Sequence, residues 1–69
     1  MSEPSIEELN NSIDALTSYK NRLKKEIIAI SQKLQMPSKK IDVTLKEHSE
    51  LKKLESTIKT LKIQRDNLM

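Results

Sequence analysis

The sequence predicts an all-α fold, an antiparallel two-helix coiled-coil hairpin that is completed by a partner chain or by self-association. The 69 residues include no glycine, the residue that tight turns between β-strands use for positive φ. Isoleucine and leucine recur every three or four residues in both halves, which is the spacing of an amphipathic helix. The segment "QMPSKK" interrupts this spacing near the middle of the chain. The prediction is therefore one small domain over residues 1–69.

The first helix is predicted over about residues 5–35. Ser5 and Glu8 have the spacing of a capping box at its start. Four heptads follow, with Lys20 as the polar residue at an a position. The apolar a and d positions of this half are Ile6, Leu9, Ile13, Leu16, Leu23, Ile27, Ile30 and Leu34.

The second helix is predicted over about residues 44–68. Thr44 and Glu47 have the spacing of a second capping box. Arg65 is at an a position. The apolar positions of this half are Leu51, Leu54, Ile58, Leu61 and Leu68. A charged residue at an a position either specifies register and partner at a cost in stability or extends its charge to water, and both interpretations apply to Lys20 and Arg65.

A break between the helices is predicted near residues 36–43. The apolar register of the second half is shifted by three residues relative to the first, and Pro37 disfavours helical geometry at Met36. A turn at this loop would bring Leu9 near Leu68 and Leu23 near Leu54. The alternative to this antiparallel hairpin is a parallel dimer whose helices continue through a proline kink, because a register shift can also occur within a continuous coiled coil.

These apolar positions form the seam between the two predicted helices. The seam by itself is too small for an independent domain. Burial of the seam residues supplies less free energy than the ordering of some sixty residues costs. Further apolar contact is therefore expected from another coiled-coil protein or from a second copy of this chain. Tyr19, Ile28 and Ile63 lie off the seam and are candidates for this contact, the alternative being scattered surface residues.

Charge is distributed unevenly along the chain. Residues 1–19 contain four acidic residues and no basic residue, whereas residues 20–46 contain eight basic residues and two acidic ones. Such a cluster can contact phosphates or an acidic surface, or can form an ordinary solvated face. No aromatic residues are interleaved with it for base stacking. The candidate contacts are Lys20, Arg22, Lys24, Lys25, Lys39 and Lys40.

Catalytic and cofactor chemistry have little basis in the sequence. There is no cysteine, no glycine-rich phosphate loop and a single histidine, His48, which is expected to be a surface residue. We expect no enzyme activity, no metal and no cofactor. No stretch is apolar enough for a transmembrane helix or a signal peptide, so we expect a soluble intracellular protein of the cytoplasm or nucleus.

The segment "LKEHSELKK", preceded by "MPSKK", resembles the small subunit of the mating-type-switching recombination-accessory family, a recombinase mediator, over residues 36–53. This resemblance implies a short helical chain that pairs with a longer coiled-coil partner and assists a strand-exchange recombinase. The sequence departs from the family at three positions. His48 and Ser49 stand where the family has an aromatic residue and asparagine, and Lys53 replaces an acid.

The function predicted from these features is that of a non-enzymatic coiled-coil assembly subunit within a larger complex. One alternative is the accessory role in homologous recombination implied by the resemblance. The other is a basic helical hairpin that binds acidic lipid or nucleic acid directly.

Overall fold

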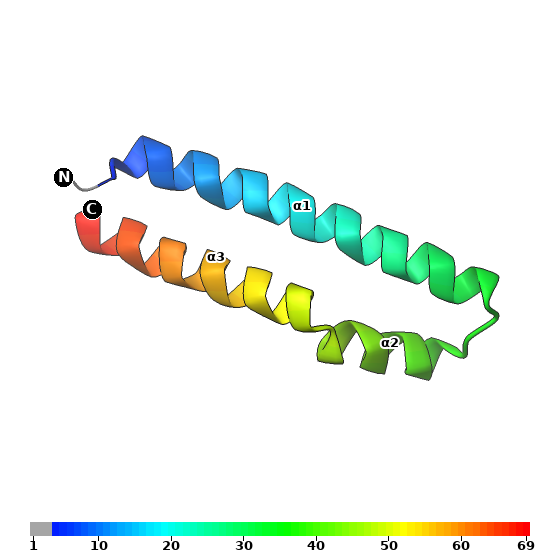
Figure 1. Cartoon of the computed structure of the whole chain (residues 1–69). Helices are drawn as coiled ribbons and strands as arrows, with labels where there is room; N and C mark the ends of the chain where they lie inside the picture. Colours follow the sequence, from blue (N-terminus) through cyan, green and yellow to red (C-terminus); the bar gives the residue numbers. More distant parts are fainter. Residues whose placement is uncertain (1–3) are drawn as a thin grey trace.

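The computed structural model describes residues 4–69, which form three helices and no strand. Helix α1 spans Ile6–Lys33, α2 spans Ser38–Glu47 and α3 spans Ser49–Leu68. Figure 1 shows that α2 and α3 return along α1, so that α1 begins and α3 ends at the same end of the molecule. The result is a rod of 49 × 19 × 16 Å. The prediction of an all-α fold is confirmed.

The start of α1 is fixed by its N-cap, as expected. The Ser5 Oγ accepts a hydrogen bond of 3.1 Å from the Glu8 backbone N–H. The Ser5 hydroxyl in turn donates to Glu8 Oε1 at 3.4 Å, so the carboxylate contacts the cap side chain instead of the cap N–H. Glu7 and Glu8 place negative charge in the first turn, which interacts favourably with the helix dipole.

The end of α1 is a Schellman arrangement built without glycine. Gln35 has φ 58°, in the left-handed region. Its N–H donates to the Gln32 carbonyl at 2.9 Å, and the Met36 N–H donates to the Ser31 carbonyl at 3.0 Å. The last helical residue is Lys33, so the first helix ends about two residues earlier than predicted.

The long loop predicted over residues 36–43 is wrong, because α2 already begins at Ser38. Pro37 is the N-cap of α2, with φ −61° and ψ 148°. Its carbonyl accepts hydrogen bonds from the N–H groups of Lys40 and Ile41, at 2.9 and 3.1 Å. A proline disfavours a helix before it but is well suited to a helix start, so Pro37 both separates α1 from α2 and initiates α2.

The predicted second helix, residues 44–68, is interrupted at His48. Thr44 is not a cap: it lies inside α2, where its Oγ1 donates to the Lys40 carbonyl at 2.8 Å. The N-cap of α3 is His48, with φ −65° and ψ 116°, whose Nδ1 accepts a hydrogen bond from the Leu51 N–H at 3.4 Å. The sequence therefore contains a helix start that the capping-box pattern does not find.

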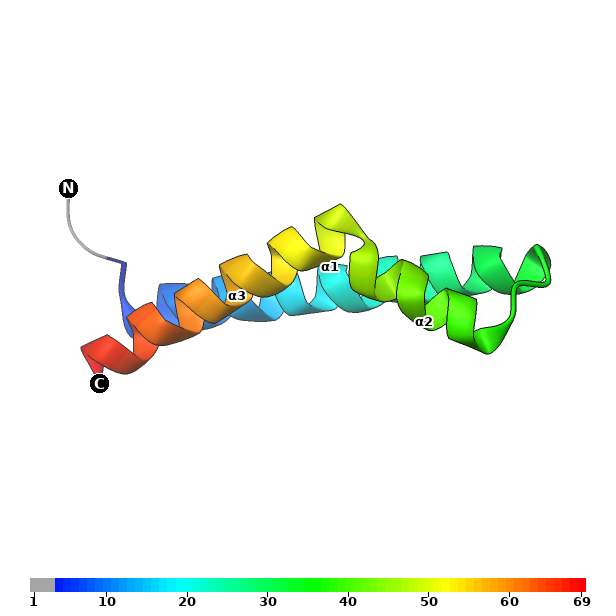
Figure 2. The same ribbon diagram turned by 90° about the horizontal axis from the view of Figure 1, so that it is seen from below.

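The break at His48 allows both halves of the returning limb to bury a residue against α1. Ile41 and Leu51 are both buried. They are ten residues apart, which in one uninterrupted helix would place their side chains about 80° apart around the axis. The bend between α2 and α3 seen in Figure 2 changes the direction of the chain between them.

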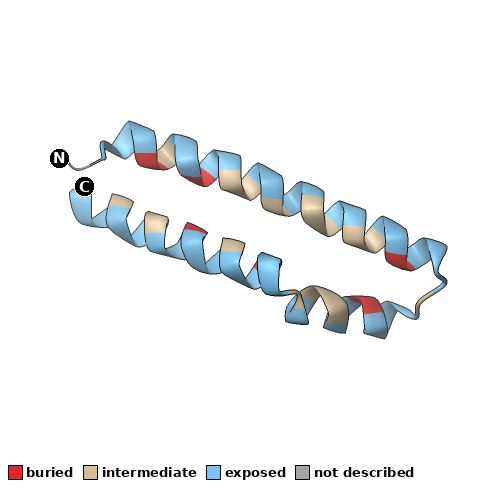
Figure 3. Cartoon of the chain, viewed as in Figure 1, coloured by how far each residue is buried: buried red, intermediate tan, exposed pale blue. Residues whose placement is uncertain are grey.

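The core is a narrow line between the two limbs, as Figure 3 shows. Of the predicted seam, Leu9, Ile13, Leu51 and Ile58 are buried. Five more seam residues are half-buried: Leu16, Leu23, Ile27, Leu54 and Leu61. The remaining four, Ile6, Ile30, Leu34 and Leu68, are exposed in the single chain, so they do not contribute to its buried core. Ile41, which was not assigned to the seam, is buried instead.

Near the end of α1 the buried residue is Ser31 and not the predicted Ile30, and helix geometry explains this difference. From the buried Ile13, five turns of 3.6 residues cover 18 residues and end at Ser31, whereas a strict heptad repeat from Leu9 selects Ile30. Ser31 is 4% exposed and Ile30 is 59% exposed. The heptad count thus loses its alignment with the partner limb after about three repeats.

Candidate interaction surfaces

The α1–α3 pair has two flanks, and residues from both helices identify each of them. On one flank the Tyr19 hydroxyl donates a hydrogen bond of 2.8 Å to Glu50 Oε1. On the other, Lys24 of α1 and Glu55 of α3 line one surface hollow. The surfaces on these two flanks differ in chemistry.

The flank that contains Tyr19 and Glu50 is mainly apolar, and we call it the leucine face. In each helix its residues are separated by three or four positions, so they form one stripe along the helix. Because the side chains of Tyr19 and Glu50 touch, the two stripes lie on the same side of the hairpin. The leucine face consists of Leu16, Tyr19, Leu23, Glu26 and Ile30 of α1 and Glu50, Leu54, Thr57, Leu61, Gln64 and Leu68 of α3.

Much of the leucine face is open to solvent. Tyr19 is 42% exposed and Ile30 is 59% exposed, whereas the leucines at the centre of the face are half-buried. Its only charged residues are Glu26 and Glu50. At the open end of the hairpin, Leu9 and Leu68 line a common hollow of about 260 Å³, as the predicted pairing of these residues requires.

The contact between Tyr19 and Glu50 affects the titration of the phenol. The hydrogen bond to the Glu50 carboxylate, together with its negative charge, raises the pKa of Tyr19 above the ordinary value of 10.0. The nearby Glu26 carboxylate acts in the same direction, and Arg22 opposes it. The tyrosine is therefore a neutral hydrogen-bond donor at physiological pH.

The other flank carries lysines from all three helices, and we call it the lysine stripe. It contains two hollows. One, of about 340 Å³, lies at the bend between α2 and α3, which we call the elbow. The other, of about 250 Å³, lies further along α3. Both include Glu55, so the two hollows adjoin. The lysines that line them are Lys20, Lys24, Lys46, Lys52, Lys59 and Lys62.

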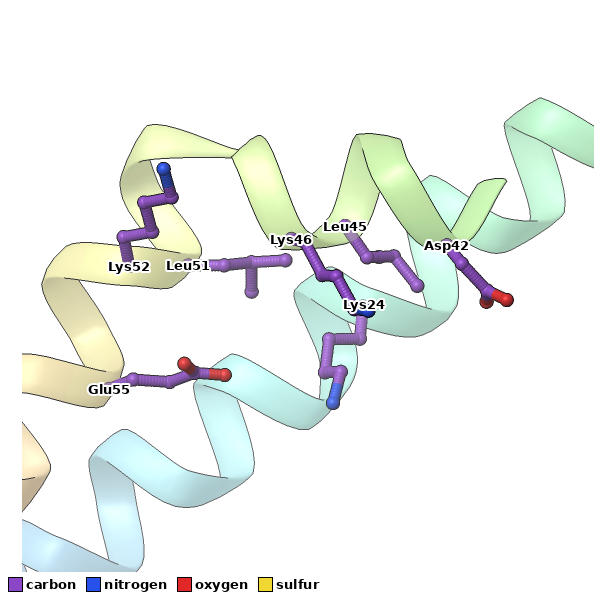
Figure 4. A pocket seen from close by; sticks show the side chains of 7 residues that line it. All are labelled: Lys24, Asp42, Leu45, Lys46, Leu51, Lys52 and Glu55. Carbon is purple, nitrogen blue, oxygen red and sulfur yellow. The ribbon is translucent and has the colours of Figure 1, made fainter. Parts of the chain in front are cut away.

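Figure 4 shows how the elbow hollow is assembled. Lys24 comes from α1, Lys46 from α2 and Lys52 from α3. Leu51 lies between Lys52 and Lys46, Leu45 lies beside Lys46 toward Asp42, and Glu55 completes the lining. Side chains from residues far apart in the sequence therefore line one hollow where the returning limb bends, with the ammonium groups of Lys24 and Lys52 pointing away from each other.

The three predicted partner contacts lie in different places. Tyr19 belongs to the leucine face. Ile28 is half-buried, and Ile63 is 52% exposed. Neither isoleucine falls in the spacing of the leucine face, so the structure does not bring the three residues together.

The predicted phosphate contacts are also divided. Lys20 and Lys24 are half-buried and line the hollows of the lysine stripe. Arg22, Lys25, Lys39 and Lys40 are exposed and line neither hollow. Lys46 lies in the basic segment 20–46 that the sequence indicates, whereas the sequence reasoning missed the three lysines of α3. The spacing of Lys52, Lys59 and Lys62, seven and three residues apart beside the seam, was a signal that they share one side of α3.

The charged residues at a positions take different roles. The Arg65 guanidinium donates from Nη1 to Asn10 Oδ1 at 3.1 Å and so joins α3 to α1. Its Nε also lies 3.4 Å from Asp66 Oδ1. Arg65 thus makes a polar contact across the helix pair, whereas Lys20 lines a surface hollow.

Residues 7–69 match the family described as a domain of unknown function (DUF8630). The chain belongs to this family. No curated protein and no solved structure matches this DUF8630 chain. The resemblance to the recombination-accessory family over residues 36–53 stays a prediction.

Within residues 4–69 no helix has the length and apolar character needed to cross a membrane. No group of three or more histidine, aspartate or glutamate side chains in the same range is arranged to hold a metal ion.

Proposed function

We propose that this protein is a non-enzymatic helical assembly subunit whose leucine face packs against the apolar face of another helical chain. The observation that supports this proposal best is the partial burial of the central leucines. Leu16, Leu23, Leu54 and Leu61 occupy seam positions, yet they are only half-buried beside Tyr19 and Ile30.

The small core supports the same proposal. Only five apolar residues are buried within residues 4–69. Domains below roughly 70–80 residues rarely obtain more than about 3–5 kcal/mol from a single core unless something else supports it. Helices packed on the leucine face would bury the outer sides of the leucines, as facing helices do in a four-helix bundle.

The charges on the leucine face favour a particular arrangement if the partner is a second copy. Glu26 lies toward the α1–α2 turn, Glu50 contacts Tyr19 near the middle of α1, and Gln64 and Leu68 lie at the open end. Two copies in antiparallel orientation would place Glu26 of each against the uncharged open end of the other. Parallel copies would bring like charges together, which is unfavourable. Another coiled-coil protein with an uncharged apolar stripe fits the same face.

The experiment that tests this proposal places charge on the leucine face. We expect Leu23→Asp combined with Leu54→Asp to abolish assembly, because two carboxylates would be buried in the interface. Ser18→Asp combined with Ser56→Asp is the matched control, since it adds the same charge at exposed positions outside the face. Sedimentation velocity measures self-association, and affinity capture followed by mass spectrometry identifies a different partner.

A second variant separates assembly from folding of the hairpin. Ile30→Asp combined with Leu68→Asp changes residues that are exposed in the single chain. It should preserve the helical circular dichroism signal and still weaken assembly. If both leucine-face variants assemble as well as the serine control does, the proposal is wrong.

A further inference from the structure

We propose that the lysine stripe binds the phosphate backbone of a nucleic acid, independently of base sequence. This site is distinct from the leucine face, and it differs from the set of basic residues selected from the sequence. Four of its six lysines, Lys46, Lys52, Lys59 and Lys62, come from the returning limb of the hairpin.

The stripe concentrates the charge of the protein. Its two hollows are lined by six lysines and two carboxylates, those of Asp42 and Glu55. Their net charge of +4 exceeds the +3 of the whole chain. The rest of the molecule is therefore close to neutral overall, and the positive potential is concentrated along this flank.

The lysines of the stripe are not neutralised by ion pairs. Within residues 4–69, the ion pair shorter than 4 Å joins Arg65 to Asp66, outside the stripe. Asp42 and Glu55 share the hollows with the lysines but do not approach them this closely. The ammonium groups thus retain their capacity to release counterions from a polyanion.

The stripe is elongated, which suits a linear ligand. Lys52 and Lys62 are ten residues apart along α3, a rise of about 15 Å. Lys46 extends the stripe beyond the start of α3, at the elbow. A row of cations of this length can contact several consecutive phosphates, whereas a single phosphate group would engage only one part of it.

The residues of the stripe indicate backbone recognition. Tyr19, the one aromatic residue of the chain, is on the leucine face, so the stripe has no ring on which a base could stack. Lysines that contact phosphates contribute affinity but do not read sequence.

A membrane surface fits the stripe less well. The apolar residues in its hollows are Leu45, Leu51 and Ile58, and the last two are buried. No apolar residue that lines the hollows is exposed, and Ile63 is the one exposed large apolar residue of α3 close to these lysines, whereas interfacial membrane helices require a broad apolar face.

The test measures binding of the full chain to a fluorescent duplex DNA of mixed sequence, by fluorescence anisotropy over a range of salt concentrations. The stripe variant carries Lys24→Gln, Lys52→Gln and Lys59→Gln. The control carries Lys25→Gln, Lys33→Gln and Lys53→Gln, which are exposed lysines outside the stripe. Both variants lose the same charge, so a general electrostatic effect would be equal in the two.

We expect the stripe variant to lower the slope of log K against log salt by about three, roughly one for each lost phosphate contact, and the control by less than about one. A second duplex of different sequence should bind equally well. If the triple variant loses helical circular dichroism signal, Lys52→Gln and Lys59→Gln are measured singly, with an expected decrease of about one each.

Three outcomes would overturn the proposal. One is equal loss in the stripe and control variants, which would show dispersed charge attraction. Another is the absence of binding to DNA and to an RNA duplex at low salt. The third is binding to vesicles that contain phosphatidylserine without binding to either duplex. Sedimentation velocity on the same variants shows whether assembly through the leucine face is intact, so failure of this inference is distinguishable from failure of the proposed function.

Discussion

Toward the open end of the hairpin, where α1 begins and α3 ends, the buried residues occupy heptad positions of the sequence, although the outermost heptad residues, Ile6 and Leu68, are exposed. Toward the α1–α2 turn, two of the buried residues lie outside the heptad positions. Leu9, Ile13 and Ile58 are buried where the heptads place them. Near the α1–α2 turn, Ile30 and Leu34 are exposed, and Ser31 and Ile41 are buried instead.

This difference shows how far a periodic pattern determines a contact. A heptad count is accurate near the point where two helices meet in phase, and its error grows by about 20° per heptad in a straight helix. Near the α1–α2 turn, α1 also faces a separate helix, α2, whose direction is set by Pro37 and His48. Polar residues that start helices therefore decide which apolar residues are buried there.

The largest expected effect compares one leucine from each end. Leu9→Ala should lower the free energy of unfolding by about 2–5 kcal/mol, because Leu9 is 3% exposed and the substitution leaves a cavity. Leu34→Ala should change it by less than about 0.5 kcal/mol, because Leu34 is 69% exposed. Urea denaturation followed by circular dichroism measures both. Similar losses for the two variants would mean that the ends pack alike.

A smaller effect is expected at the break between α2 and α3. His48→Ala should destabilise the protein by about 1 kcal/mol, because the Leu51 N–H loses its acceptor. His48→Asp should restore the stability or exceed it, since a carboxylate is a better N-cap. Ser49→Ala is the adjacent control and should have little effect. Thermal unfolding measures all three, and a stability of His48→Ala equal to that of the unchanged protein would argue against a separate α3.

The smallest effect concerns the end of α1 and has the opposite sign. Gln35→Gly should stabilise the protein by about 0.5–1 kcal/mol, because glycine avoids most of the cost of φ 58° while adding some flexibility to the unfolded chain. Gln32→Gly, inside the same helix, should destabilise it by about 1 kcal/mol. Chemical denaturation of the two variants compares them. A loss of stability in Gln35→Gly would contradict the left-handed geometry of Gln35 after the end of α1.

The sequence alone determined the fold class, the start of α1 at Ser5 and the interruption at Pro37. These features depend on local chemistry: apolar spacing, a hydroxyl that accepts from a nearby N–H, and a ring that restricts the preceding residue. Local chemistry also predicted the apolar core near Leu9 and Leu51.

Only the tertiary structure decided which side of each helix faces its partner. The cap at His48 is unusual for a histidine, so no sequence rule placed α3 in phase with α1. Once that phase is set, the half-buried leucines fall on one flank and lysines from three helices fall on the other. Burial, unlike helix formation, depends on the relative rotation of segments that are distant in the chain, and a single sequence does not encode that rotation in any local pattern.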